Sequence, residues 1–264
     1  MFKPGDNVIL YDKKERVYLI NLEQESNFES HLGNIAHNDI IGIEEGNWVQ
    51  TNNGHWLLAF KPTRNEFVVN MDRIATVIYP KDSAAIINKA NLNMGSKVIE
   101  AGSGSGSLTI AISEAIGPKG HLFSYDLRED MSNKAKQNFN KLLPNSDNVT
   151  FKIGDINLKI DEKEADAIVF DLPEPWHAVD QALVSLRHGG VIIAFLPTIM
   201  QVSNYVDSLK DTLQFSLIET TELLERPWTI GGRSIRPDHR MTGHTGFITF
   251  ARKCFIRPDK ESTE

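Results

Sequence analysis

The stretch Lys97-Val98-Ile99-Glu100-Ala101-Gly102-Ser103-Gly104-Ser105-Gly106-Ser107 predicts a strand, a glycine-rich loop and the start of a helix. The helix is indicated by apolar residues at the spacing of one helical face, which are Leu108, Ala111, Ile112, Ala115 and Ile116. Gly117-Pro118 ends it. Glycines let a ligand approach the backbone closely, and the free amide groups at the start of a helix favour a polar ligand group. We therefore expect a small-molecule site at the end of this strand.

The spacing of the glycines separates two classes of ligand. Dinucleotide-binding loops need G-x-G-x-x-G, whereas Gly102, Gly104 and Gly106 form G-x-G-x-G. Glu100 adds an acid before the loop, which suits the ammonium and sulfonium groups of S-adenosylmethionine (SAM) better than a diphosphate. About twenty residues after Gly106, Asp126 ends an apolar run and can accept hydrogen bonds from ribose hydroxyls in either class. The pattern favours SAM over a nicotinamide dinucleotide, and a glycine-rich turn without a ligand is the other alternative.

The composition bounds the class of protein. A chain of 264 residues is long enough for one large domain and a smaller one, and 41% hydrophobic and 24% charged residues are typical of a soluble protein. The single cysteine, Cys254, allows no intrachain disulfide and fits a reducing compartment. No window approaches the roughly 18 apolar residues of a membrane helix, and the first residues do not resemble a signal peptide. We expect a cytoplasmic protein that requires no membrane and no metal.

The charge is distributed unevenly along the chain. A net charge of -7 argues mildly against nucleic acid as a partner. However, the stretch from Arg226 to Arg257 carries six arginines and Lys253 against one acid, Asp238. This stretch is either a surface that contacts phosphates or a solvated basic loop, and charge alone does not separate the two.

The pattern divides the chain into two domains and a tail. In residues 1–75, short alternating runs are separated by turn signals, and Asn53-Gly54 is typical of a β-hairpin. We expect a small β-rich, barrel-like domain there. In residues 76–258, strands and helices alternate, which predicts an α/β domain with a mostly parallel sheet and helices on both faces. Residues 259–264 are expected to be a frayed tail.

Tyr79 lies on a stiff segment before the large domain. Pro80 favours an extended backbone at Tyr79, and Asp82 or Ser83 is expected to cap the helix that follows. The Tyr79 ring could cover a bound ligand or pack at the domain junction.

Two acids follow predicted strands at the edge where open α/β sheets bind ligands. Asp155 comes after the run 149–153 and could meet an adenine amino group or cap a turn. Asp171 comes after the run 165–170 and opens a loop stiffened by two prolines, 171–176. It is either a catalytic carboxylate or the cap of a helix marked by Val179, Ala182, Leu183 and Leu186 and ended by Gly189-Gly190. Further on, strands near 213–224 and 245–253 are expected to pair at the sheet edge, with the arginine-rich loop between them.

With these pieces placed, the sequence resembles the tRNA (adenine-N1)-methyltransferase family, which modifies adenine 58 of the T-loop and, in archaeal members, adenine 57. The resemblance covers nearly the full length. It is carried by 33–42 (GNIAHNDIIG), 78–82 (IYPKD), 100–106 (EAGSGSG), 171–176 (DLPEPW) and 236–247 (RPDHRMTGHTGF). It implies a Rossmann-like, seven-stranded SAM-dependent methyltransferase sheet with a small N-terminal β domain, SAM as cofactor, tRNA as partner and, outside eukaryotes, a homotetramer.

The resemblance also implies roles for individual residues. Asp171 and Tyr79 would be catalytic. The residues expected to bind SAM are Glu100, Gly102, Gly104, Ser105, Gly106, Ser107, Leu108, Asp126, Met131, Asp155, Ile156 and Asp171, with Asp126 at the ribose and Asp155 at the adenine. The residues expected to bind tRNA are Trp176, Arg226, Arg233, Arg236 and Arg240. Many members have glutamate where Asp126 stands, and some archaeal members bridge subunits with cysteines that this chain lacks.

Four other functions compete with this one. Enzymes that methylate the exocyclic amino group usually present Asn or Asp, Pro, Pro and an aromatic residue at this edge, and Leu172 and Glu174 break that pattern, so N1 is preferred. A SAM-dependent enzyme with a protein or small-molecule acceptor fits the glycine loop equally well. A non-catalytic RNA-binding subunit is disfavoured by the intact loop, and an oxidoreductase by the glycine spacing. Whether adenine 57, 58 or both would be modified is left open.

Overall fold

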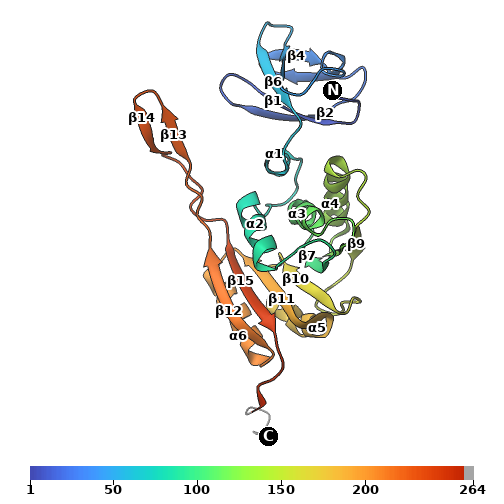
Figure 1. Cartoon of the computed structure of the whole chain (residues 1–264), viewed down its shortest axis with the longest axis vertical. Coiled ribbons are helices and arrows are strands. Elements are labelled where there is room, and N and C mark those ends of the chain that lie inside the picture. The colour runs from blue at the N-terminus through green and yellow to red at the C-terminus, as the bar shows by residue number, and fades with distance from the viewer. Residues whose placement is uncertain (259–264) are drawn as a thin grey trace. The chain divides into compact units, whose positions relative to one another are not determined.

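The computed structural model describes residues 1–258, so the expected tail, 259–264, lies outside the described residues (Figure 1). The chain forms two compact units, Met1–Asp72 and a second that begins at Arg73. None of the helices in residues 1–258 is long and apolar enough to cross a membrane.

The first unit is built from short antiparallel strands. Its elements are β1 (Asn7–Tyr11), β2 (Val17–Asn21), β3 (Asn27–Ser30), β4 (Gly33–Ala36), the 3-10 helix η1 (His37–Asp39), β5 (Asn47–Gln50), β6 (Trp56–Phe60) and α1 (Arg64–Asn70). Four strands form a sheet in the order β2-β1-β6-β5, and β3 pairs with β4. The expected hairpin around Asn53-Gly54 joins β5 to β6, with Gly54 at φ +81°. Val8, Leu10, Ile35 and Leu57 lie in its buried core.

The second unit contains the seven-stranded sheet. Its elements are α2 (Pro80–Lys89), β7 (Lys97–Ala101), α3 (Ser107–Ile116), β8 (His121–Asp126), α4 (Glu129–Leu142), β9 (Val149–Ile153), β10 (Ala165–Phe170), η2 (Pro175–Ala178), α5 (Val179–Ser185), β11 (Leu186–Leu196), α6 (Ile199–Asp211), β12 (Phe215–Glu222), β13 (Trp228–Gly231), β14 (Ser234–Pro237) and β15 (Phe247–Lys253). The strand order is β12-β15-β11-β10-β7-β8-β9. Strands β7 to β11 are parallel, and β15 is antiparallel to both of its neighbours. The fold class expected from the sequence is confirmed.

The central strands are apolar on both sides because helices cover both faces of the sheet. Val98 packs into one core together with Ile112 of α3, whereas its neighbour Ile99 packs into a second core with Ala182 of α5 and Tyr205 of α6. The chain runs outward from β7 through β8 and β9, then returns to the other side of β7 with β10. This reversal of strand order at β7 leaves a crevice outside the carboxyl ends of the strands, which is where such sheets bind ligands.

Three local predictions were wrong. Helix α2 begins at Pro80 with Tyr79 as its N-cap residue, so neither Asp82 nor Ser83 caps it; proline is favoured at the first helical position because it needs no hydrogen bond there. Helix α5 ends at Ser185, and Leu186 already belongs to β11. Gly189 and Gly190 therefore lie inside the strand, where the pairing with β10 shifts its register.

The arginine-rich segment between β12 and β15 is more ordered than expected. Strands β13 and β14 form a hairpin within it, which Figure 1 shows projecting from the β12–β15 edge of the sheet. The expected pairing of the two flanking strands at that edge is confirmed, from Phe215 opposite Lys253 to Glu222 opposite Phe247.

Candidate active site

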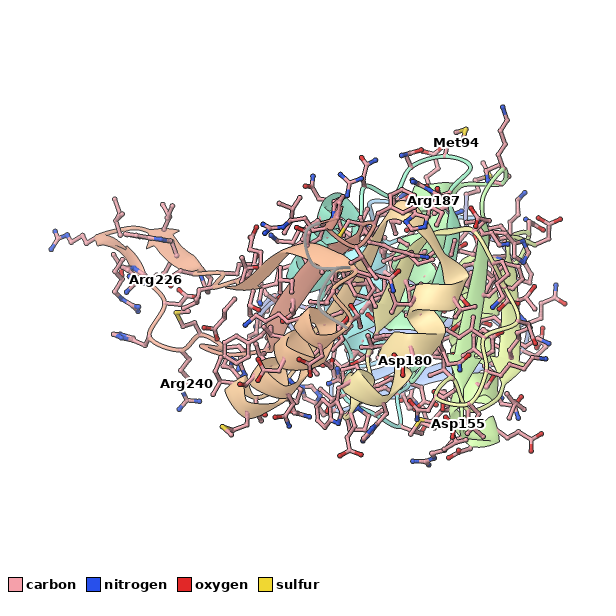
Figure 2. The ribbon with its side chains drawn as sticks, turned by 90° about the horizontal axis from the view of Figure 1, so that it is seen from below. Met94, Asp155, Asp180, Arg187, Arg226 and Arg240 are labelled. Carbon is pink, nitrogen blue, oxygen red and sulfur yellow. The ribbon has the colours of Figure 1, made fainter. Side chains whose placement is uncertain are left out.

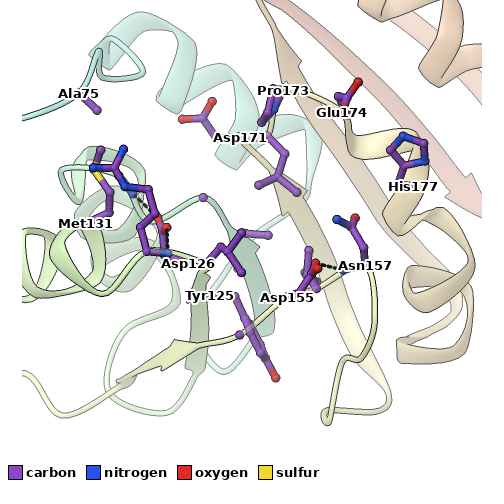
Figure 3. Close-up of a pocket in the computed structure, with 18 of the residues that line it drawn as sticks. Ala75, Tyr125, Asp126, Met131, Asp155, Asn157, Asp171, Pro173, Glu174 and His177 are labelled. Carbon is purple, nitrogen blue, oxygen red and sulfur yellow. Dashed lines mark hydrogen bonds between the residues drawn. The ribbon is translucent and has the colours of Figure 1, made fainter.

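A cavity of about 460 Å³ opens where β7, β8, β9 and β10 end. Its volume falls within the range of small-molecule sites. Predicted residues that line it are Gly102, Gly104, Asp126, Met131, Asp155, Ile156 and Asp171. Figure 3 shows the side chains of Asp126, Asp155 and Asp171 around this cavity. The strand ends thus bring together residues up to about seventy positions apart in the sequence.

The glycine loop joins the ends of three strands. Gly102 donates its amide hydrogen to Tyr125 O at the end of β8 (2.8 Å), and Asp171 donates its own to Ala101 O (2.8 Å). Gly102 has φ +93°, and a Cβ there would lie 2.1 Å from Asp171 O, so only glycine fits. Gly106 packs against Ala135 of α4, whereas a Cβ on Gly104 would meet nothing closer than 4.0 Å. Gly104 is therefore the glycine that leaves room above the loop.

Asp126 supports the loop and keeps oxygen lone pairs available. Its carboxylate accepts hydrogen bonds from the backbone amides of Gly104 (3.1 Å) and Arg128 (2.9 Å). One bond falls on each oxygen, and each carboxylate oxygen can accept more than one. The side chain is half-buried at the end of β8, in the position from which an acid can accept hydrogen bonds from a ribose.

Asp171 is a half-buried carboxyl group without a hydrogen-bond partner for its side chain in the part of the chain that the structure describes. Burial, together with the negative charge of Asp126, raises the pKa of Asp171 to about 7. A group in this state binds a ligand that brings positive charge or an N–H donor, because either one stabilises the carboxylate. Asp171 thus has the free acceptors that chemistry at this cavity would use.

Glu100 lies beneath the loop and outside the cavity lining. One of its oxygens accepts hydrogen bonds from Thr109 Oγ1 and Ser124 Oγ, both at 2.6 Å, and the other has no partner among the described residues. Complete burial raises the pKa of Glu100 to about 8, against the effect of the two hydroxyl donors. The structure places this acid as a support for the loop, and its contact with a cofactor stays a prediction.

Four other predicted cofactor residues also lie outside the lining. Ser105 Oγ accepts from the amides of Ile74 and Ala75, and Ser107 Oγ donates to Ile78 O. Gly106 is the N-cap of α3, and Leu108 packs in the core on that face of the sheet. These residues hold the loop in place, together with the segment 74–78, which includes the lining residues Ala75 and Thr76.

Tyr79 and Trp176, predicted to face the base, do not line the cavity in this structure. Trp176 packs against the core, and its Nε1 donates to His177 Nε2 at 3.1 Å. Lining residues that the sequence analysis missed are Ala75, Thr76, Ala101, Tyr125, Leu127, Arg128, Gly154, Asn157, Leu172, Pro173, Glu174 and His177. Most of them adjoin a predicted residue in the sequence. The loops after the strands were therefore the signal that could have found them, because each loop at the switch point lines the cavity with several consecutive residues.

The four predicted RNA-binding arginines lie on or beside the projecting hairpin. Figure 2 shows Arg226 and Arg240 on this segment, and Arg233 and Arg236 lie at its turn and in β14. Three of the side chains are exposed, Arg236 is half-buried, and none forms a salt bridge within residues 1–258. Arginine side chains that form no salt bridge with the protein are available to bind phosphates.

Comparison with known proteins identifies the family. Residues 55–236 match the family model described as the tRNA methyltransferase complex GCD14 subunit, and residues 1–49 match the TrmI-like N-terminal model. Methanocaldococcus jannaschii tRNA (adenine(57)-N(1)/adenine(58)-N(1))-methyltransferase TrmI is 36% identical over 92% of this chain and 94% of its own length. Thermus thermophilus tRNA (adenine(58)-N(1))-methyltransferase TrmI is 32% identical over 95% and 97%.

Two solved structures share the fold of this chain. The tRNA (m1A58) methyltransferase TrmI from Aquifex aeolicus superposes with a TM-score of 0.84 at 29% identity, covering 96% of this chain and 99% of its own. A Thermotoga maritima protein described as a SAM-dependent O-methyltransferase superposes with a TM-score of 0.92 at 33% identity, covering 97% and 96%. From its seven-stranded sheet, its glycine loop and these relatives, the chain belongs to the tRNA (adenine-N1)-methyltransferase family.

Proposed function

We propose that this protein transfers a methyl group from SAM to N1 of adenine 58, adenine 57 or both in the T-loop of tRNA. The observation that carries the proposal is the charge of the cavity: Asp126, Asp155, Asp171 and Glu174 line it against a single arginine, Arg128, which pairs with Asp130 (2.6 Å). An acidic cavity attracts a cation and repels a diphosphate. SAM carries an ammonium and a sulfonium group, so the lining supports SAM and disfavours a nicotinamide dinucleotide.

The residues present fit SAM in their chemistry. Asp126 offers acceptors for ribose hydroxyls, and Asp155 keeps a carboxylate oxygen free of the bond that its Oδ1 accepts from Asn157 N (2.9 Å). Met131 and Ile156 supply apolar walls for an adenine. Gly104 leaves its backbone open to the methionine part. When bound, SAM supplies an electrophilic methyl group.

Adenine N1 is a neutral nucleophile and its product is cationic, so no proton has to leave before attack. The protein has to align N1 with the methyl group and favour the growing positive charge. The carboxylate of Asp171 does both: it accepts a hydrogen bond from the exocyclic amino group and places negative charge beside the ring. The product remains paired with this carboxylate until it leaves.

The base must leave its stacked position in tRNA to reach the cavity, at a cost of roughly a few kcal/mol. Thr76 and His177 line the cavity. Tyr79 comes shortly after Thr76 in the sequence, and Trp176 comes directly before His177. We infer that these two aromatic residues contact the extruded adenine when RNA is bound. Phosphate contacts from the four arginines offset the cost of extrusion.

The homotetramer and the cytoplasmic location expected from the sequence stay predictions. For the tetramer, support comes from Trp228, Ile230 and Ile235, which are 55%, 76% and 72% exposed on the projecting hairpin. Large apolar side chains gathered on an exposed element are typical of an association surface.

Incubation of unmodified tRNA with the protein and SAM is expected to yield 1-methyladenosine, measured by nucleoside mass spectrometry. Primer extension would then stop at position 57, 58 or both. Methylated product in protein or small-molecule fractions and none in tRNA would instead favour the other acceptor classes. SAM that binds in calorimetry without any methylated product would favour a non-catalytic RNA-binding subunit.

Replacing Arg226, Arg233, Arg236 and Arg240 with Gln is expected to weaken tRNA binding and its dependence on salt. Each lost phosphate contact lowers the slope of log affinity against log salt by roughly 0.7–0.9, so four lost contacts change it by about three. Filter binding between low and moderate salt measures this slope. The matched control replaces four exposed lysines elsewhere, Lys119, Lys136, Lys141 and Lys210, with Gln. Equal slopes for both variants would show that the hairpin does not contact phosphates.

A further inference from the structure

The arginine hairpin is fixed to the sheet through a narrow connection. We define the extension as residues 225–242, which hold β13, β14 and the four arginines, and the neck as residues 222–224 and 243–246. The two segments of the neck continue from the end of β12 and lead into the start of β15. The direction in which the extension leaves the sheet is therefore set by whatever holds the neck.

Lys81 of helix α2 bonds to both segments of the neck. Its ammonium donates to Leu223 O (2.8 Å), to Thr245 Oγ1 (2.6 Å) and to Asp82 Oδ1 (2.8 Å). These three bonds satisfy all three N–H donors. The Lys81 side chain is 15% exposed and that of Asp82 is fully buried, so the bonds are made largely out of water, where bonds to a charged donor are strong.

A second residue, His244, also fastens the neck. His244 Nδ1 lies 2.6 Å from Glu222 Oε1, and its Nε2 lies 2.8 Å from Pro197 O at the end of β11. Both neighbours are acceptors, so only the protonated ring can donate at both nitrogens. The Glu222 carboxylate, followed by the Pro197 carbonyl, raises the pKa of His244 and favours that form.

Helix α2 is a suitable anchor because it begins beside the cavity. The carbonyl of its N-cap residue, Tyr79, accepts hydrogen bonds from the amides of Asp82 (2.9 Å) and Ser83 (3.0 Å). Three residues before Tyr79, Thr76 lines the cavity. Lys81 thus ties the base of the extension to the segment that forms the cavity wall.

We propose that Lys81 is a positioning residue for tRNA: it clamps the neck so that the arginines of the extension point at the tRNA backbone while the target adenine reaches the cavity. The inference rests on the proposed function for the identity of the RNA. Without the Lys81 bonds the neck is held by His244 and its two partners, so the extension samples more directions and only a fraction of molecules presents the arginines correctly. If that fraction falls to about a tenth, the apparent Kd for tRNA rises about tenfold.

The test variant combines Lys81→Met with Asp82→Asn, which removes both charges together and leaves neither unpaired in a buried site. The matched control is Lys89→Met. Lys89 lies on the same helix and also bonds to strand β12, through Glu219 Oε1 at 2.8 Å, but away from the neck. In the double variant, the Kd and KM for tRNA are expected to rise about tenfold, while kcat and the SAM Kd stay within about threefold. The control is expected to match the wild type in all four.

This split separates positioning from a general structural role, since a damaged fold would also weaken SAM binding. A tRNA Kd in the double variant equal to that of Lys89→Met would overturn the proposal. If the double variant fails to bind SAM, Thr245→Val decides, because it removes one bond to the neck without changing charge. It is expected to raise the tRNA Kd with SAM binding unchanged, and an unchanged tRNA Kd would overturn the proposal. Filter binding needs no catalysis, so a wild type that binds tRNA without methylating it refutes the proposed activity and still tests the clamp.

Discussion

Replacing Asp171 with Asn is expected to lower kcat/KM for tRNA methylation by about 100- to 1,000-fold, the usual effect of removing one group that stabilises transition-state charge. The amide has nearly the same shape but no negative charge beside the ring that becomes cationic. Initial rates with radiolabelled SAM at pH 8 measure the effect. The matched control is Asp180→Asn, an exposed acid in the first turn of α5. A rate for Asp171→Asn within threefold of the wild type would show that Asp171 is not catalytic and only forms part of the loop.

The same substitution is expected to change the pH profile. Burial and the charge of Asp126 raise the pKa of Asp171 from 3.8 to about 7, so in the free protein the active carboxylate forms only as the pH rises through about 7. Wild-type kcat/KM should therefore climb up to that pH and then level off, and this limb should be absent in Asp171→Asn.

The raised pKa also fixes the sign of the effect on stability. Between pH 4 and 7 the folded protein holds a proton that the unfolded chain releases, so this group's contribution to stability falls as the pH rises through that window. At pH 8 the wild type carries a partly desolvated anion that Asn lacks. Asp171→Asn is thus expected to be at least as stable as the wild type at pH 8, and thermal unfolding would show that lost activity is not lost folding.

The sequence was sufficient for the architecture because its signals are local. The run Lys97 to Ala101, the glycines and the apolar face of α3 each depend on a few neighbouring residues, and the order of such units determines the sheet. Asp126 and Asp171 were found because Asp126 ends one predicted strand and Asp171 directly follows another, and strand ends meet at one edge of a parallel sheet.

Local patterns could not show which side of a loop faces the ligand. Ser105 lies in the glycine loop and Ser107 begins α3, yet their hydroxyl groups bond to the backbone at Ile74, Ala75 and Ile78. Spacing alone does not distinguish a side chain that binds a cofactor from one that holds the loop in place. The distinction depends on a segment about thirty positions away in the sequence.

The contacts of Lys81 are still more remote, because its partners Leu223 and Thr245 lie 142 and 164 positions along the chain. No periodicity or composition signal links residues at that separation. The β13–β14 hairpin did carry a local signal, Gly231-Gly232 between the alternating runs at Trp228 and Ile235, which is typical of a tight turn. The basic composition of the segment led to its interpretation as a loop, and this hid the turn signal, because charge does not indicate backbone pairing.

Replacing Gly102 with Ala is expected to destabilise the second unit by about 2–5 kcal/mol. A Cβ at this residue would lie 2.1 Å from Asp171 O and 2.9 Å from Asp171 C, and a backbone carbonyl cannot move aside as a side chain can. Forced overlap of this kind costs about 1–3 kcal/mol, and a positive φ adds about 1–2 kcal/mol for a residue with a Cβ. Urea unfolding followed by circular dichroism measures the loss.

Gly104→Ala is the matched control, since Gly104 also has a positive φ, +52°, but a Cβ there has no neighbour within van der Waals contact apart from Gly102 O at 4.0 Å. We expect a loss of only about 1–2 kcal/mol, from the backbone conformation alone. The difference between the two variants isolates the contact between the glycine loop and the strand end that carries Asp171. Because Gly102→Ala must push these segments apart, it should also displace Asp171 and reduce methylation beyond what lost folding explains. Equal destabilisation by the two substitutions would mean that Asp171 O can yield, and that the close approach of β7 and β10 is not what requires glycine at this position.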